Sequence, residues 1–453
     1  MWWLPNSDIS IERRLLRILG LEDIDPLFSD IPQSLIKKKP PDLPSYDEIE
    51  VEQVFRRIIS ENCCLGEWKF FLGGGCWFHY VPAVIDEVSS KQEFYTSYTP
   101  YQAEISQGAL QAIFEYQSLM AELLEMDVVN ASHYDWSTAL AEAALMTMRI
   151  TKRKEILVPE NMHPERLEVL RTYLFGAGGR IRTYSFDKKR GTVLLDSLDP
   201  NSDTAMVYLE NPNFFGVVED EAEAVGEKAH SKGALYVMGV DPLSLGILKP
   251  PGECGADIAV GEGQHLGSYP SFGGPSLGIM AAKWDLRLVR QMPGRLIGMT
   301  WSKSGVRGYV MTLQTREQHI RQERATSNIT TNESLMAIRA AVYLSLMGAE
   351  GLRNICMKII GNTQYLIEEI GSLDKFESPV FDQVHFREFL VRSSLDWDVV
   401  NSQLRSMKII GGLPLSRFGE KFRELGNSAL FCTTEIHSKD DLDLLVHALR
   451  RVS

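Results

Sequence analysis

The chain has 453 residues, of which 44% are hydrophobic and 24% charged, and its formal net charge at pH 7 is −13. That length exceeds what one compact core accommodates, so two or three domains of an ordinary globular protein are expected. The acidic balance argues against a general nucleic-acid-binding or anionic-membrane surface, because both require a basic footprint.

Cysteine usage and the first residues favour a cytoplasmic protein. Six cysteines in so long a chain indicate no disulfide framework, and Cys63 and Cys64 are adjacent rather than spaced as metal ligands. The start, MWWLPNSDIS, lacks the basic and apolar regions of a signal peptide, and no run reaches the roughly 18 apolar residues of a membrane span. No zinc-ligand spacing, P-loop or serine-nucleophile elbow is found, and no metal site is expected.

Residues 1–60 are predicted to form an arm of short helical pieces. Apolar residues at helical spacing favour a helix over 11–19, and the prolines from Pro26 to Pro44 then exclude a long helix. Such an arm seldom builds a core of its own. We therefore expect it to cover either its own body or a partner subunit.

Two of the next segments have the composition of pocket walls. Gly73, Gly74 and Gly75 permit positive φ or close backbone approach, either in a strained turn or in a loop that faces a cofactor. Residues 95–108 combine tyrosines with polar side chains and show no periodicity, so they would be costly to bury without partners. This tyrosine segment is expected to line a pocket or to form an aromatic contact between subunits.

Two helices are predicted after the tyrosine segment. Residues 109–126 carry an apolar stripe at helical spacing, which indicates a core helix. A polar turn over 130–135 then leads to an alanine-rich helix over 139–149, which Ser137 or Thr138 can cap. The unpaired backbone N–H groups at the start of such a helix suit an anion.

From residue 155 onward, predicted strands and helices alternate, which implies parallel strands joined by right-handed crossovers. The ligand crevice of such a sheet is expected at the carboxyl ends of the strands. The expected elements are strands over 156–158, 180–184, 206–209, 234–238, 256–260 and 277–282, and helices over 164–175, 219–231 and 286–291.

The remaining residues supply a basic segment and a second folded region. The arginines from Arg307 to Arg324 lead into ATSN and can contact an anionic group across an interface, although solvated or ion-paired arginines are an equal alternative. Thr330 and Glu333 have the spacing of a capping box at the start of an apolar helix over 332–347. A helix over 350–370, strands near 384–386 and 430–435, and helices near 396–408 and 440–450 complete a smaller α+β domain.

Five segments carry a resemblance to a known family: YTPYQAEISQG at 98–108, NPNFFGVVED at 211–220, GEGQ at 261–264, SFGGP at 271–275 and LQTREQHIRQERATSN at 313–328. They resemble the N-terminal half of the glycine decarboxylase P-protein, which in many prokaryotes is a separate subunit. The resemblance implies an α/β fold with a mainly parallel sheet, that of the pyridoxal phosphate (PLP)-dependent transferases (aspartate aminotransferase-like, fold type I). It also implies a helical arm at 1–60, a large domain at 61–310 and a smaller α+β domain at 311–453.

Compared with the catalytic half of that family, this chain lacks the residues that hold the cofactor. Gln264 and His265 stand in the region of the lysine that binds PLP, and Met238 takes the place of the aspartate that pairs with the pyridine nitrogen. Asp241 is either a shifted substitute or, as we expect, a turn or capping residue. Trp136 stands where relatives have a small residue, at a turn where it would obstruct the PLP phosphate.

The resemblance implies the non-cofactor-bearing subunit of a glycine decarboxylase, acting with a homologous PLP-bearing subunit 2 in an α2β2 heterotetramer. That complex would decarboxylate glycine, release CO2 and transfer the aminomethyl group to the lipoyl group of H-protein. The alternatives are a self-sufficient PLP enzyme that uses Lys249 or Lys283, and a non-catalytic scaffold. The residues expected to line a pocket or interface are Gly73, Gly74, Gly75, Tyr98, Thr99, Tyr101, Gln102, Ser106, Asn213, Gln264, Arg324, Ser327 and Asn328.

Overall fold

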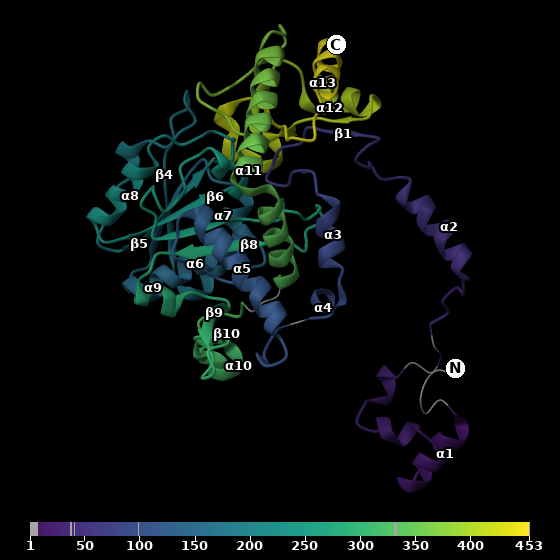
Figure 1. The fold of residues 1–453 in the computed structure, drawn as a ribbon. Helices are drawn as coiled ribbons and strands as arrows, with labels where there is room; N and C mark the ends of the chain where they lie inside the picture. The colour runs from purple at the N-terminus through teal and green to yellow at the C-terminus, as the bar shows by residue number, and fades with distance from the viewer. Residues whose placement is uncertain (1–7, 37–38, 40, 98, 330–332, 453) are drawn as a thin grey trace. The chain divides into compact units, whose positions relative to one another are not determined.

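The computed structural model describes residues 8–36, 39, 41–97, 99–329 and 333–452 (Figure 1). The chain divides into two compact units, Met1–Cys63 and Cys64–Ser453. The described part of the first unit contains α1 Ile9–Ile18, the 3-10 helices η1 Asp25–Phe28 and η2 Gln33–Leu35, and α2 Glu48–Ile59. The prolines lie at or between the ends of these elements, as their missing N–H group requires.

A seven-stranded sheet forms the centre of the second unit, in the order β2-β8-β7-β6-β5-β3-β4. The five strands from β7 to β4 are parallel to one another, while β8 pairs antiparallel with both β7 and β2. The strands are β2 Val128–Val129, β3 Glu155–Pro159, β4 Arg180–Tyr184, β5 Thr204–Asn211, β6 Leu235–Val240, β7 Ile258–Glu262 and β8 Gly278–Ala282.

Helices pack on both faces of this sheet. Within β6, Met238 belongs to one buried hydrophobic cluster and Val237 to the other, as the two-residue period of a strand requires. The helices of the first cluster are α5 Gln107–Leu124, α8 Ala222–Ser231 and the first half of α11 Ser334–Gly371. Those of the second cluster are α6 Trp136–Thr151, α7 Pro164–Ala177 and α9 Leu286–Gln291.

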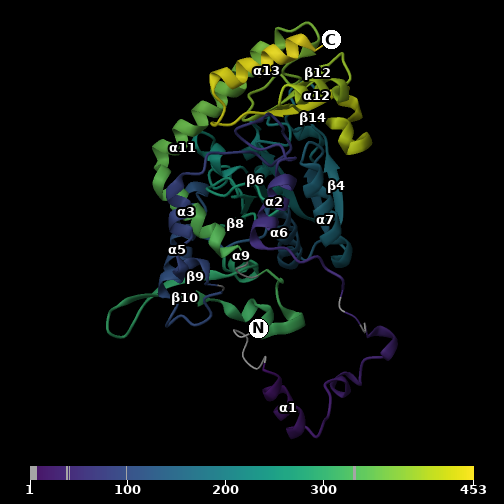
Figure 2. The ribbon, with the colours of Figure 1, turned by 90° about the vertical axis from the view of Figure 1, so that its right-hand side faces the viewer.

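A smaller antiparallel sheet, in the order β11-β12-β15-β14, lies near the C-terminus. Two helices and the second half of α11 share a buried cluster with it, and Figure 2 shows them gathered around it. The elements are β11 Phe376–Glu377, β12 Glu388–Ser393, α12 Trp397–Ser406, β14 Leu413–Pro414, η7 Leu415–Leu425, β15 Ser428–Cys432 and α13 Lys439–Arg451. A parallel pair, β1 Lys69–Phe70 with β13 Ile409–Ile410, joins an early segment to this region.

Shorter elements connect these layers. They are α3 Ala83–Ser89, α4 Gln92–Tyr95, η3 Leu195–Ser197, η4 Pro242–Gly246, the antiparallel hairpin of β9 Leu296–Trp301 and β10 Arg307–Thr312, η5 Gln314–Arg316, α10 Gln318–Arg321 and η6 Gln322–Arg324. Among the described helices, α11 is long and apolar enough to cross a membrane by length and composition. Its buried side chains pack into two core clusters of the protein, as those of a core helix do.

Two details of the predicted elements are wrong. The strand expected over 384–386 begins instead at Glu388, because His385 forms an isolated bridge with Val217 and Arg387 adopts a positive φ of 55° before the strand. The hairpin of β9 and β10 was not expected at all. The break expected between the helices over 332–347 and 350–370 is present, because Gly348 within α11 has a non-helical backbone conformation.

The capping box predicted at Thr330 lies outside the described residues. The separation of residues 61–310 from 311–453 as two domains stays a prediction.

Candidate functional site

Residues that follow three neighbouring parallel strands line two adjoining cavities. Asn213 follows β5 and Asp241 follows β6, and both line a small cavity of about 20 Å³. Glu262 ends β7 and lines an open cleft of about 240 Å³, and Gly75 and Trp136 line both spaces. The cleft therefore lies at the edge where open α/β sheets bind their ligands.

The glycine loop forms one wall of this cleft. Gly74 and Gly75 adopt φ values of 114° and 89°, which other residues rarely reach. A Cβ atom on Gly73 would lie 2.7 Å from Cγ of Leu430, and one on Gly75 would lie 3.0 Å from Nε2 of His163. The glycines are thus required by both the backbone conformation and the close approach of neighbouring elements.

Another wall of the cleft is the start of α6. The prediction that Ser137 or Thr138 caps this helix is wrong. Asp135 is the N-cap, and its carboxylate accepts a hydrogen bond from the N–H of Thr138 at 2.8 Å. The Thr138 hydroxyl oxygen accepts a hydrogen bond from the N–H of Asp135, and the two bonds together form a capping box. The helix consequently begins at Trp136, three residues earlier than expected.

Trp136 fills the space beside this helix start. Its side chain is buried, the guanidinium carbon of Arg166 lies 3.4 Å from a ring centroid, and its Nε1–H donates to the Tyr208 hydroxyl at 3.0 Å. The Tyr208 hydroxyl donates in turn to Glu210, which forms an ion pair with Arg166 at 3.0 Å. These four side chains form a closed network beside the start of α6.

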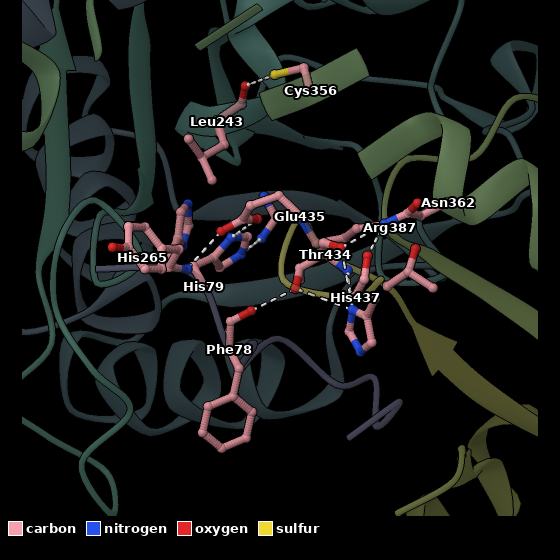
Figure 3. Close-up of polar contacts among 12 residues, drawn as sticks. Phe78, His79, Leu243, His265, Cys356, Asn362, Arg387, Thr434, Glu435 and His437 are labelled. Atoms are coloured by element: carbon pink, nitrogen blue, oxygen red, sulfur yellow. Dashed lines mark hydrogen bonds and ion pairs between the residues drawn. The ribbon is translucent and has the colours of Figure 1, made fainter. Parts of the chain in front are cut away.

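Five charged or titratable side chains form a buried polar cluster near the small cavity, and Figure 3 labels four of them, His79, His265, Arg387 and Glu435; the fifth is Asp241. Arg387 forms an ion pair with Asp241 and donates from Nη1 to Nε2 of His79 at 2.8 Å. Nδ1 of His79 lies 2.7 Å from a carboxylate oxygen of Glu435. Nε2 of His265 lies 2.8 Å from Asp241. The cluster links the ends of β6 and β7 to the C-terminal sheet.

The charges of this cluster follow from burial and pairing. Burial lowers the pKa of His79 to about 4, so its neutral ring accepts from Arg387 at Nε2 and donates from Nδ1 to Glu435. Burial alone would raise the pKa of Asp241, but the Arg387 guanidinium and the His265 ring outweigh it and hold that pKa well below its ordinary value. Asp241 also accepts from the N–H of Leu243, so the capping role expected for it is present.

The residues at this place do not fit PLP. The side-chain amide of Gln264 is bound to the carbonyl of Ser268, and Met238 is buried in the hydrophobic core. Neither can form a Schiff base or pair with a pyridine nitrogen. Lys249 lies on the surface in an ion pair with Glu223, and the Lys283 ammonium donates to a backbone carbonyl, so neither lysine lines the cleft. A self-sufficient PLP enzyme is therefore not supported.

The tyrosine segment lies against the arginine-rich motif, LQTREQHIRQERATSN at 313–328, rather than in the cleft. The Tyr101 hydroxyl accepts from Nη2 of Arg295 at 3.1 Å, and its half-exposed ring faces the ring of His319. Arg295 is buried and paired with Glu317. Gln102 is exposed, Thr99 and Ser106 are partly buried, and Tyr98 lies outside the described residues. The structure thus brings together two of the motifs that the sequence singled out.

The other predicted residues are dispersed. The side-chain amide of Asn213 is hydrogen-bonded within its own turn. Its NH2 group donates to Glu219, and its oxygen accepts from the N–H groups of Phe215 and Val217. The Ser327 hydroxyl donates to Glu142 on α6 at 2.7 Å. Arg324 and Asn328 are exposed and do not line the cleft.

Several residues that shape the cleft were missed. Arg387, Glu388 and Glu435 lie far from the glycine loop in sequence, and only folding brings them near it. His79 is only four residues after Gly75, but its buried partners, Arg387 and Glu435, come from the C-terminal region. Glu262 lies inside the GEGQ motif, but only Gln264 and His265, in the region of the absent lysine, were predicted to matter there.

Comparisons with known proteins agree along the whole chain. A family model described as "Glycine cleavage system P-protein" matches residues 3–449. A relative from Staphylothermus marinus, named "Probable glycine dehydrogenase (decarboxylating) subunit 1", is 47% identical over 99% of this chain and 97% of its own. A relative of the same name from Aeropyrum pernix is 46% identical over 99% and 98%.

Solved structures extend this similarity to the fold. A crystal structure of glycine decarboxylase (P-protein) of the glycine cleavage system, in inhibitor-bound form, is 40% identical, with a TM-score of 0.90 and full coverage of both chains. A NifS-like protein from Rickettsia africae shares the fold at 12% identity, with a TM-score of 0.62 over 85% of this chain and 99% of its own. The predicted PLP-transferase fold is therefore confirmed, and the chain belongs to the glycine cleavage system P-protein family.

Proposed function

We propose that this chain is the subunit of a glycine decarboxylase that does not carry the cofactor. It works in the cytoplasm with a lysine-bearing subunit 2, in an α2β2 complex that decarboxylates glycine and releases CO2. The complex passes the aminomethyl group to the lipoyl group of H-protein. The observation that carries the proposal is that, among the described residues of this P-protein chain, no lysine lines the cleft, which is bordered by the buried Trp136 and its partners.

The geometry assigns this chain a supporting role in that reaction. PLP, held by subunit 2, supplies the electron sink for decarboxylation. The residues of this chain proposed to reach the partner are those of the tyrosine segment and the arginine-rich motif, which the structure places side by side. The names of its relatives describe an enzyme, so a non-catalytic scaffold is not favoured.

Borohydride reduction of the complex tests where the cofactor is bound. Reduction converts a Schiff base into a stable amine, so the labelled lysine can be mapped by peptide mass spectrometry. We expect the label on a lysine of subunit 2 and none on this chain, because Lys249 and Lys283 lie outside the cleft. A labelled lysine in this chain would contradict the proposal. This chain purified alone and treated with PLP is the control for random surface labelling.

Tyr101→Phe tests whether the tyrosine segment serves the reaction. The substitution removes one hydroxyl and keeps nearly all of the ring's apolar area. If the segment orders substrate or the lipoyl arm, turnover of the reconstituted complex should fall about tenfold, equivalent to about 1.4 kcal/mol.

Tyr95→Phe, on a more exposed ring of the same segment, is the matched control and should leave turnover unchanged. Size-exclusion chromatography checks that each complex assembles. Unchanged turnover for Tyr101→Phe in a complex of normal size would assign the segment to packing.

A further inference from the structure

Two structures that commonly bind anions border the cleft. One is the start of α6, where the first N–H groups lack partners within the helix and the helix dipole favours negative charge. The other is the glycine loop, whose positive φ values turn consecutive N–H groups toward one side. In this chain a carboxylate of the protein itself is bound at each.

Glu262 is bound at the first position. Its Oε1 atom accepts from the N–H of Gln264 at 2.8 Å, the N–H of Leu277 at 3.0 Å and the hydroxyl of Ser276 at 2.8 Å. Its Oε2 atom accepts from the N–H of Trp136 at 3.2 Å. Four donors from three separate segments therefore converge on one nearly buried carboxylate. Within the described part of the chain, no basic side chain forms an ion pair with it.

Glu388 is bound at the second position. Its Oε1 atom accepts from the N–H of Gly74 at 2.6 Å, with the N–H of Gly75 at 3.4 Å. Glu388 is the first residue of β12 and is 4% exposed, so it approaches the loop from the C-terminal sheet. Burial raises the pKa of Glu388, and hydrogen bonds from Trp77 and the loop N–H groups, together with the Arg387 charge, offset only part of that rise.

We propose that Glu262 and Glu388 are built-in anions that occupy the two anion-binding positions of this cleft and thereby hold its walls in place without a bound ligand. Glu262 ties the start of α6 to the segments that flank the SFGGP motif, and Glu388 ties the glycine loop to the C-terminal sheet. Both are positioning residues. This role concerns the chain by itself and is independent of the reaction proposed above.

The proposal predicts that a small anion can replace either side chain. Glu262→Ala leaves four donors without their acceptor, so the thermal midpoint of the variant should fall by roughly 5 °C or more. The substitution also leaves a gap into which formate can fit. Sodium formate or sodium phosphate, compared with sodium chloride at equal ionic strength, should restore at least half of that loss. The midpoint of the unmodified full-length chain should be the same in all three salts.

Two control variants separate replacement from general salt effects. In Glu262→Gln a neutral amide fills the same space, so formate should not restore its midpoint. Glu165→Ala removes an exposed carboxylate from the first turn of α7 and should show neither the loss nor the recovery.

Equal stabilisation of the unmodified chain and of Glu262→Ala by formate would overturn the proposal. An unchanged midpoint for both Glu262→Ala and Glu388→Ala would overturn it as well. If Glu262→Ala does not fold, Glu388→Ala and the smaller change Glu262→Ser, measured in the same three salts, decide the question.

Discussion

Replacement of Arg387 by methionine is expected to lower the free energy of unfolding by roughly 3–5 kcal/mol, the usual result of removing one partner of a buried ion pair. Arg387 is 1% exposed, and it pairs with Asp241, donates to His79 and lies 4.1 Å from the Trp77 ring centroid. Methionine preserves much of the side-chain volume but leaves Asp241 charged and buried with His265 as its remaining partner. The loss should appear as a lower urea midpoint for the purified chain.

A double-mutant cycle distinguishes the loss of the ion pair from the loss of packing. Asp241→Asn alone leaves the guanidinium buried without its counter-charge and should also be costly. The combined variant, Arg387→Met with Asp241→Asn, removes both charges and should be markedly more stable than the sum of the two single losses predicts.

Arg423→Met is the matched control, because Arg423 forms an exposed pair with Glu420 and its loss should change stability by less than about 1 kcal/mol. Strict additivity in the cycle would mean that the Arg387 and Asp241 side chains act independently.

The elements of the large sheet could be predicted because each carries a local signal. Strands β3, β5, β6, β7 and β8 are short, mainly apolar runs that are buried on both faces, where helices cover the sheet. Glycine or proline marks several of their ends. The resemblance supplied the type of fold, but not the order of the strands. The hairpin of β9 and β10 escaped prediction because its strands are partly exposed and do not alternate cleanly between apolar and polar residues.

The candidate site was predicted less well, for a physical reason. The sequence indicated what is absent, a lysine and an aspartate, because both have fixed places at strand ends. The residues that occupy those places in the folded protein could not be predicted from the neighbouring sequence. Glu388 and Arg387 reach the glycine loop and Asp241 only because the C-terminal sheet packs against the strand ends. Trp136 was singled out from the sequence, but the network that buries it, through Tyr208, Glu210 and Arg166, involves elements distant in sequence.

The largest expected effect concerns the activity that this chain shares with subunit 2, because we expect no activity from this chain alone and full activity from the mixture. Among the described residues no lysine lines the cleft, and Met238 stands where an aspartate would pair with the pyridine nitrogen, so this chain lacks the groups that make PLP an electron sink. The chain with PLP and lipoylated H-protein should therefore show no exchange of the glycine carboxylate with labelled bicarbonate. Addition of the lysine-bearing subunit should bring the rate to that of an ordinary enzyme, on the order of 1 s⁻¹ or more.

The control is the same mixture made with a variant of subunit 2 in which the PLP lysine is replaced by arginine. That mixture should assemble normally and remain inactive, which assigns the covalent chemistry to the partner. The variant also excludes activity from contaminating enzyme in either preparation.

Glycine–bicarbonate exchange by the separate and mixed subunits is the most direct test of the central claim. The account predicts background rates for this chain alone and full exchange for the mixture with intact subunit 2. Exchange by this chain alone at the rate of the mixture, or a mixture no faster than subunit 2 by itself, would contradict it.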